Sequence, residues 1–258
     1  MKLRKINEVS LTATDINIGD TIKVGLTANL TIDKIPEELQ KAFEKIREIV
    51  NQKANNPDYA KSLKQQNITM SPLLFAHLFV FAMVIAEAFP DLSCKDNKRR
   101  FFYAENPTAK LSELFDKHLF KCAEYATIAQ LYLQSVGVDS EYVGGEYLNI
   151  ETAELFGDQH SFVIVHENDI DYVFDPANNN AGAKPNISVI ELSPEQKVKL
   201  QARLLTNKRK VAFFETRDII TNRKYFYGYG DGCNILEDMV FEKEQTTPNT
   251  FVKDLSRN

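Results

Sequence analysis

Three residues whose types suit nucleophilic catalysis occur in the middle of the chain, in the order Cys122, His160 and Asp175. A cysteine thiol has an ordinary pKa of about 8.5, so only a few per cent of it is the nucleophilic thiolate at neutral pH. A helix N-terminus and a neighbouring imidazolium both lower the pKa of a thiol, to roughly 3.5–7.5. A carboxylate bound to the other ring nitrogen holds the imidazole in place. The set therefore predicts a cysteine hydrolase or acyltransferase.

The cysteine is expected to open a helix. After Cys122, the apolar residues Ala126, Ala129 and Leu133 recur at helical spacing, and Gly137 marks the C-terminal stop. No good N-cap residue precedes the cysteine, so this start is inferred from the apolar pattern alone. Such a helix places the thiol at its positive end.

The histidine and the aspartate are expected to lie on the two strands of a β-hairpin. Residues 161–165 and 172–174 are β-branched and aromatic, and polar turn formers separate them. A turn centred on Glu167-Asn168 places His160 directly opposite Asp175. Facing residues have Cβ atoms about 4.5–5.5 Å apart, close enough for an imidazole–carboxylate hydrogen bond.

The inferred contact between His160 and Asp175 depends on the position of the hairpin turn. If the turn is shifted by one residue, His160 faces Ala177 or Val173 in place of Asp175. The hairpin itself is expected with either turn.

These segments resemble the transglutaminase-like core, a branch of the papain-like cysteine enzymes. The resemblance covers about residues 119–177 and is carried by Cys122-Ala-Glu124-Tyr-Ala126, Gly137-Val138 leading to Val143-Gly144-Gly145, His160-Ser-Phe-Val-Ile-Val and Tyr172-Val-Phe-Asp175-Pro176. In that family the cysteine attacks an amide carbonyl and forms a thioester, the histidine moves protons and the aspartate orients the histidine. The resemblance implies these roles for Cys122, His160 and Asp175.

The resemblance further implies a hydrolase of amide bonds, either a peptidase or a protein glutamine deamidase, with a protein or peptide as its substrate. Small bacterial proteins of this fold include secreted effectors that deamidate glutamine. Family members often carry Trp near these motifs, and this chain has none, so hydrolysis is expected over cross-linking. A transglutaminase and a non-catalytic binding module with the same fold remain alternatives.

The thioester chemistry needs donors for a developing oxyanion. The backbone N–H of Cys122 is expected to be one of them, and the side chain of Asn106 is a candidate for the second.

The other cysteines are weaker candidates. Cys94 lies in a polar stretch, and Cys233 follows a glycine-rich turn but has no histidine after it. An odd number of cysteines without an evident signal peptide favours a reducing compartment. The expected location is the cytoplasm, or the exterior by a route that uses no cleavable signal peptide.

The histidines raise the question of a metal. His160 and His166 share a strand face, and His118 lies four residues before Cys122, but no pair has the spacing of a zinc motif. No metal or cofactor is expected, and a zinc-binding regulatory protein is kept as a third class. His77 is expected to be a buried core histidine, and His118 to lie on the surface.

The composition limits the partners. A formal net charge of −5 and a pI near 5.5 argue against nucleic acid. The longest apolar run, residues 72–89, is short for a membrane span and contains His77 and Glu87, so a buried helix is expected. The amino-acid sequence does not indicate an oligomeric state.

The whole chain is expected to adopt an α+β fold, a papain-like or transglutaminase-like core with a helical layer packed on an antiparallel sheet. Residues 1–65 are expected to form an N-terminal appendage or part of the same globule, and residues 66–258 the catalytic domain. The expected elements are a β-prone segment at 1–34, helices at 36–52, 72–89, 111–115 and 194–207, a polar loop at 91–100, a short strand or loop at 101–103, strands at 138–143, 211–214, 225–227 and 239–241, and a loop at 177–186.

Overall fold

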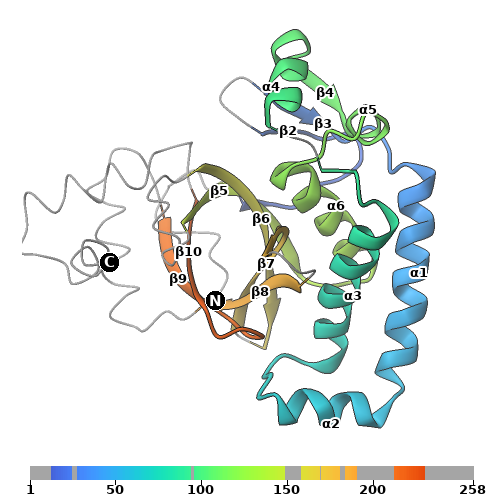
Figure 1. Ribbon diagram of the computed structural model, residues 1–258, viewed down its shortest axis with the longest axis vertical. Coiled ribbons are helices and arrows are strands. Elements are labelled where there is room, and N and C mark those ends of the chain that lie inside the picture. Colours follow the sequence, from blue (N-terminus) through green and yellow to red (C-terminus); the bar gives the residue numbers. More distant parts are fainter. Residues whose placement is uncertain are drawn as a thin grey trace, which may run out of the picture.

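An antiparallel sheet that closes on itself forms one side of the fold (Figure 1). The structure, a computed structural model, describes residues 13–24, 28–93, 96–148, 158–168, 170–180, 184–190 and 212–229. Neighbouring strands follow the order β1-β5-β10-β9-β8-β7-β6, and β5 also pairs with β6, which closes a barrel. Its strands are β1 (Ala13–Thr14), β5 (Ser140–Leu148), β6 (Asp158–Glu167), β7 (Ile170–Asn180), β8 (Lys184–Ile190), β9 (Ala212–Asp218) and β10 (Lys224–Tyr229).

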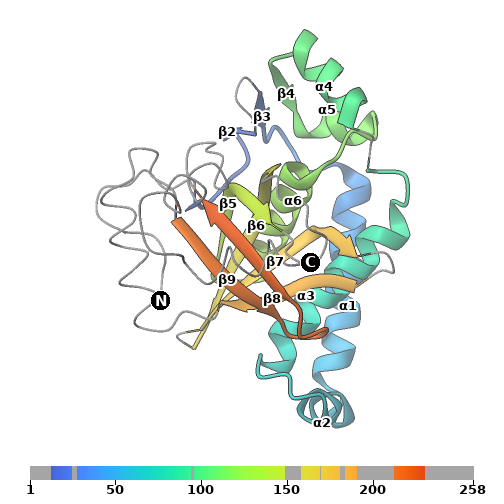
Figure 2. The ribbon, with the colours of Figure 1, turned by 60° about the vertical axis from the view of Figure 1, so that its left-hand side comes forward.

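Helices cover one side of this barrel (Figures 1 and 2). The helix α6 packs on β5, β6 and β7, α3 packs on β8, and α1 lies against the outer side of α3. A small sheet of β2 (Thr21–Lys23), β3 (Asn29–Thr31) and β4 (Thr108–Lys110) lies beside α4 and α5. The helices are α1 (Glu37–Ala54), α2 (Pro57–Gln65), α3 (Pro72–Ala88), α4 (Asp96–Glu105), α5 (Leu111–Asp116) and α6 (Cys122–Ser135). The α+β class with helices packed on an antiparallel sheet is confirmed.

The apolar run at 72–89 forms the helix α3, as predicted. Ser71 is its N-cap, with the side-chain oxygen accepting from the N–H of Leu74 at 3.3 Å, and Pro72 occupies the first turn. His77 is buried, as expected, and its Nδ1 lies 2.8 Å from the hydroxyl of Tyr132. Among the described residues, no helix combines the length and the apolar character that a membrane crossing needs.

One hydrophobic core joins the helices to the barrel. The ring of Tyr132 on α6 packs on Phe43 of α1 and Phe81 of α3, with centroid distances of 5.2 and 5.3 Å. Phe81 in turn meets Phe174 of β7 edge to face at 5.9 Å. The first 65 residues and the rest of the chain thus contribute to the same core, and the division at residue 65 stays a prediction.

Two predicted segments between α3 and α6 are wrong. The polar loop expected at 91–100 and the strand or loop expected at 101–103 are replaced largely by α4, which covers Asp96–Glu105. The reason is tertiary, because helical spacing places Arg99 and Tyr103 on one side, where both contact Glu124 of α6.

Three other predictions need correction. A helix that was not predicted, α2, follows α1, with Pro57 in its first turn and Asn56 as its N-cap. The strand expected at 138–143 continues to Leu148, because Gly144 and Gly145 pair with β6. The loop expected at 177–186 is instead largely the ends of β7 and β8, with a register shift between Asp175 and Asn180.

Other elements agree with expectation within a few residues, namely α1, α5, α6, β9 and β10. The expected helix at 194–207, the expected strand at 239–241, Cys94 and Cys233 lie outside the described residues.

Candidate active site

Cys122 is the first residue of α6 and is partly exposed. The residue before it, Lys121, has no side-chain acceptor for the free N–H groups of the first turn. The helix start is instead stabilised by a side chain within the helix, which accepts from the backbone of Lys121. The Lys121 N–H donates to Oε2 of Glu124 at 2.9 Å, the second half of a capping box. At the other end, Gly137 has a φ of 74°, the left-handed conformation that ends helices. The thiol therefore lies at the positive end of a helix that packs on the barrel.

The hairpin of β6 and β7 has a different register from the expected one. Val163 pairs with Phe174 and Glu167 with Ile170, so the turn lies one residue later, at Asn168, whose φ is 49°. The direct pairing of His160 with Asp175 is therefore wrong.

The contact itself forms nonetheless. Shifting a turn by one residue moves the facing partner by two, and residues two apart lie on the same face of a strand. His160 and Asp175 are consequently diagonal neighbours on one face, and His160 Nε2 lies 2.6 Å from Asp175 Oδ2.

His160 also contacts the thiol. It makes a side-chain hydrogen bond with Cys122, and because Nε2 is bound to Asp175, Nδ1 is the nitrogen left for this bond. Burial opposes a charge on the ring, whose side chain is only 14% exposed, but Asp175 and Cys122 outweigh it and raise the pKa of His160 to about 10. The imidazole is therefore protonated at neutral pH. The three residues singled out from the sequence come together in one hydrogen-bonded series.

Asp175 is fully buried and is held from across the barrel. The hydroxyl of Tyr227 donates to its Oδ2 at 3.1 Å, and the side-chain amide of Asn186 donates to the Tyr227 oxygen at 2.7 Å. The backbone N–H of Ala177 donates to Oδ1 at 3.2 Å. Because β10 and β7 are not neighbours in the sheet, the Tyr227–Asp175 bond crosses the interior of the barrel.

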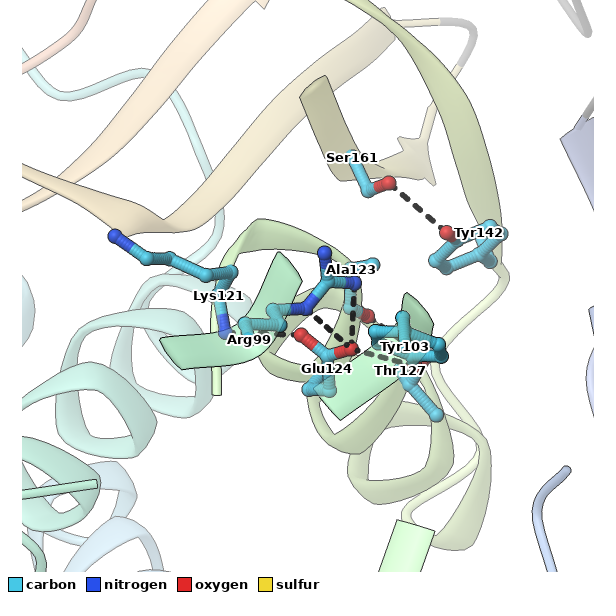
Figure 3. A network of polar contacts seen from close by, with 8 residues as sticks. All are labelled: Arg99, Tyr103, Lys121, Ala123, Glu124, Thr127, Tyr142 and Ser161. Carbon is cyan, nitrogen blue, oxygen red and sulfur yellow. Dashed lines mark hydrogen bonds and ion pairs between the residues drawn. The ribbon is translucent and has the colours of Figure 1, made fainter. Parts of the chain in front are cut away.

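A buried ion pair lies at the start of α6 (Figure 3). Arg99 of α4 donates through Nε and Nη2 to Oε1 of Glu124, at 3.1 and 2.7 Å, and the hydroxyl of Tyr103 lies 3.3 Å from the same oxygen. Burial opposes the charge on Arg99, but Glu124 outweighs it and raises the pKa of the guanidinium, with Cys122 acting in the same direction. Arg99 is thus a fixed cation within electrostatic reach of the thiol, and it holds the glutamate that caps the helix.

A second buried tyrosine, Tyr142 of β5, lies near Tyr103 at the start of α6 (Figure 3). The hydroxyl of Tyr142 donates to Oγ of Ser161, next to His160, at 2.9 Å (Figure 3). Burial raises the pKa of Tyr142, and Cys122 and Glu124 raise it further, so this hydroxyl stays protonated near the thiol.

The sequence did not single out Arg99, Tyr103, Tyr142, Asn186 or Tyr227. A hint was available for Glu124, since an acidic residue three positions after a helix start is the second half of a capping box. Nothing in the local pattern indicates that Tyr227 crosses the barrel.

The remaining candidates have other surroundings. The side-chain amide of Asn106 donates to the carbonyl oxygen of Phe102 at 3.1 Å, at the end of α4. His118 is exposed, as expected, with Nδ1 3.2 Å from the carbonyl oxygen of Asp91. His166 pairs with Asp171 at 2.7 Å and faces Glu141 at 3.6 Å. Within the part of the chain that the structure describes, no group of His, Cys, Asp and Glu side chains has the arrangement of a metal site.

Comparison of the chain with family models, with curated proteins and with solved structures gave no match in any of the three. The function is therefore argued from the geometry of the site.

Proposed function

We propose that the protein is a cysteine-dependent hydrolase of amide bonds with a transglutaminase-like core. The observation that carries the proposal is the hydrogen-bonded series Cys122, His160 and Asp175, in which one imidazole contacts both a thiol at a helix N-terminus and a buried carboxylate. Each part matches what thiol catalysis requires, namely an activated nucleophile, an acid–base group and an orienting group.

The fold assignment is supported by how the elements present these residues. A helix begins with the nucleophile and packs on an antiparallel barrel, and one hairpin of that barrel carries the histidine and the aspartate. This order of cysteine, histidine and aspartate is the one that the resemblance implied.

The reaction proceeds in two halves. The Cys122 thiolate attacks the amide carbonyl carbon, the C–N bond breaks, and the imidazolium of His160 gives its proton to the leaving amine. Water then attacks the thioester while neutral His160 takes a proton from it, the C–S bond breaks, and the acid is released with the thiolate and the imidazolium restored. Asp175 keeps the imidazole oriented and favours its charged form throughout.

The developing oxyanion needs donors near the start of α6. The Cys122 N–H belongs to the first turn, where amides point out of the helix. A single donor of this kind commonly contributes about 3–4 kcal/mol to the transition state. The substrate is either a peptide bond or the side-chain amide of a protein glutamine, since both pass through the same thioester.

The test measures thiol activation before any substrate is known. The alkylation rate of each cysteine is followed against pH by mass spectrometry in the wild type, in His160→Ala and in the control His118→Asn, which replaces an exposed histidine before α6. Cys122 is expected to react fast below pH 7, to lose that advantage in His160→Ala, and to keep it in His118→Asn.

Cys94 and Cys233 serve as internal reference thiols in the same samples. If Cys122 in the wild type is no more reactive below pH 7 than these two, the proposal is wrong and a non-catalytic binding module becomes the better explanation.

A further inference from the structure

A cavity of about 150 Å³ lies between the C-terminal half of α3, the start of α6 and the strand β7. Its α3 wall includes Ala82, Ala86 and Phe89, and its mouth includes Pro90 and Ser93, which are both exposed. The cavity therefore opens to solvent and is lined mainly by apolar side chains.

Three wall segments of this cavity are adjacent to the residues of the proposed active site. Tyr125 lies one helical turn after Cys122, on the same side of α6. Pro176 directly follows Asp175 in β7.

The third segment contains Ser93. It runs parallel to the stretch that leads into the nucleophile, since Ser93 forms a bridge with Phe120 and the Phe120 N–H donates to the Leu92 carbonyl oxygen at 3.0 Å. A substrate bound at the thiol thus has this cavity next to it.

We propose that this cavity is a specificity pocket that receives one large apolar side chain of the substrate, aromatic or branched, next to the amide bond that is cleaved. The proposal rests on the proposed function and narrows the substrate to peptides with such a residue.

Size and chemistry support this occupant. An apolar cavity of about 150 Å³ in another protein holds a benzene molecule, so the volume here suits a phenyl ring or a branched aliphatic group. Among the nine side chains of the wall, only Ser93 and Tyr125 carry a polar atom. A charged side chain would be desolvated there without a partner of opposite charge. The seven apolar side chains of the wall instead gain from burying an apolar group.

The pocket also offers a way to distinguish the substrates that the triad leaves open. A glutamine side chain is long and polar, whereas this cavity favours an apolar group beside the scissile bond. Peptide-bond cleavage after or before a large apolar residue is therefore the reaction that fits it.

The experiment compares two thiol-reactive probes with the same electrophile, N-methylchloroacetamide and N-(2-phenylethyl)chloroacetamide. The alkylation rate of Cys122 is measured by mass spectrometry and is divided by the rate of the same probe with the urea-unfolded chain. In the wild type, the phenyl probe is expected to react at least tenfold faster on this scale.

Two alanines of α3 give matched variants. Ala86→Leu fills the pocket and is expected to remove most of the phenyl preference while changing the rate of the methyl probe less than twofold. Ala88→Leu adds the same side chain at an exposed position of the same helix and is expected to leave the preference intact. Ser93→Leu, at the exposed mouth, is a second blocking variant in case Ala86→Leu does not fold.

Equal normalised rates for the two probes, with Cys122 still activated below pH 7, would overturn the pocket and leave the proposed function standing. A preference that survives both Ala86→Leu and Ser93→Leu would also overturn it. A Cys122 that reacts with both probes no faster than in the unfolded chain would instead overturn the proposed function and the pocket together.

Discussion

The hairpin of β6 and β7 contains two histidine–carboxylate pairs of nearly the same length. His160 and Asp175 are joined at 2.6 Å near its open end, and His166 and Asp171 at 2.7 Å near its turn. Both imidazoles are largely buried, and the pKa of each is raised above the ordinary value of histidine. By distance, burial and charge alone, the two pairs are almost the same.

The difference lies in the third group at each pair. His160 gives Nε2 to its aspartate, and its other contact is the thiol of Cys122. His166 gives Nδ1 to its aspartate, and its Nε2 faces a second carboxylate, Glu141, at 3.6 Å. One pair thus ends in a thiol, and the other places a cation between two buried acids. The comparison teaches that a short histidine–aspartate bond does not by itself indicate catalysis.

The largest expected effect is on stability, at the pair near the turn. His166→Leu removes the cation that faces the buried carboxylates Asp171 and Glu141, which is expected to lower the free energy of unfolding by about 3–5 kcal/mol. His160→Leu is expected to cost only about 1–3 kcal/mol, because Asp175 keeps its bonds from Tyr227 and the Ala177 N–H. Urea unfolding of the two variants measures the difference, and the opposite order would contradict it.

The next effect is on the reactivity of Cys122. Here the larger loss is expected at the pair of His160 and Asp175, and the smaller loss at the pair of His166 and Asp171. Asp175→Asn removes the negative charge that raises the pKa of His160, so the imidazolium that favours the thiolate is less populated. The alkylation rate of Cys122 at pH 6 is expected to fall about tenfold or more. A tenfold fall corresponds to a loss of about 1.4 kcal/mol in the stabilisation of the imidazolium by Asp175.

The matched variant is Asp171→Asn at the other pair, which is expected to change this rate less than twofold in folded protein. Equal losses in the two variants would mean that the pairs do not differ in the way the geometry indicates.

A smaller effect is expected for the donor that crosses the barrel. Tyr227→Phe removes one bond to Asp175 and the acceptor of the Asn186 amide, at a cost of about 1 kcal/mol or somewhat more in the free energy of unfolding. The Cys122 alkylation rate is expected to fall only a few-fold, because the His160–Asp175 bond remains. Tyr59→Phe on α2 is the control for the same exchange, and an equal loss in both variants would argue against a special role of Tyr227.

A further effect is a dependence of stability on pH. Burial opposes the charge on His166, but hydrogen bonds with Asp171 and Glu141 outweigh it and raise its pKa to about 9, while that of His160 is about 10. A histidine whose pKa is higher in the folded than in the unfolded chain contributes stability that is complete below about pH 6.5 and is lost as the pH rises through the folded value.

The urea midpoint is therefore expected to fall as the pH rises from about 6.5 towards 10. His166→Gln is expected to remove the part of this fall that is centred near pH 9. A midpoint in the wild type that rises over this range would contradict the assignment of both charged imidazoles.

The sequence predicted the parts of the site that depend on local pattern. The helix that begins at Cys122 follows from apolar spacing, and the faces of β6 and β7 follow from alternation, which survives the error in the turn. The helix α4 and the position of Arg99 did not follow, because its polar sequence becomes helical through contacts with Glu124 of another element.

Barrel closure is the other property that local pattern does not contain. The strands β9 and β10 were predicted as strands, but their order in the sheet depends on pairings between segments far apart in the chain. Tyr227 could therefore be placed in a strand but not next to Asp175.

The bond from Tyr227 to Asp175 has a consequence for how the protein matures during synthesis. The chain leaves the ribosome from its N-terminus, so Cys122, His160 and Asp175 all emerge before β10, which supplies the tyrosine. The buried carboxylate receives its donor from β10 only when that last described strand docks between β5 and β9. A nascent chain that ends before Tyr227 thus contains Cys122, His160 and Asp175 in its sequence but lacks the bond that crosses the barrel, and the hydrogen bonds around Asp175 are complete only when the barrel closes.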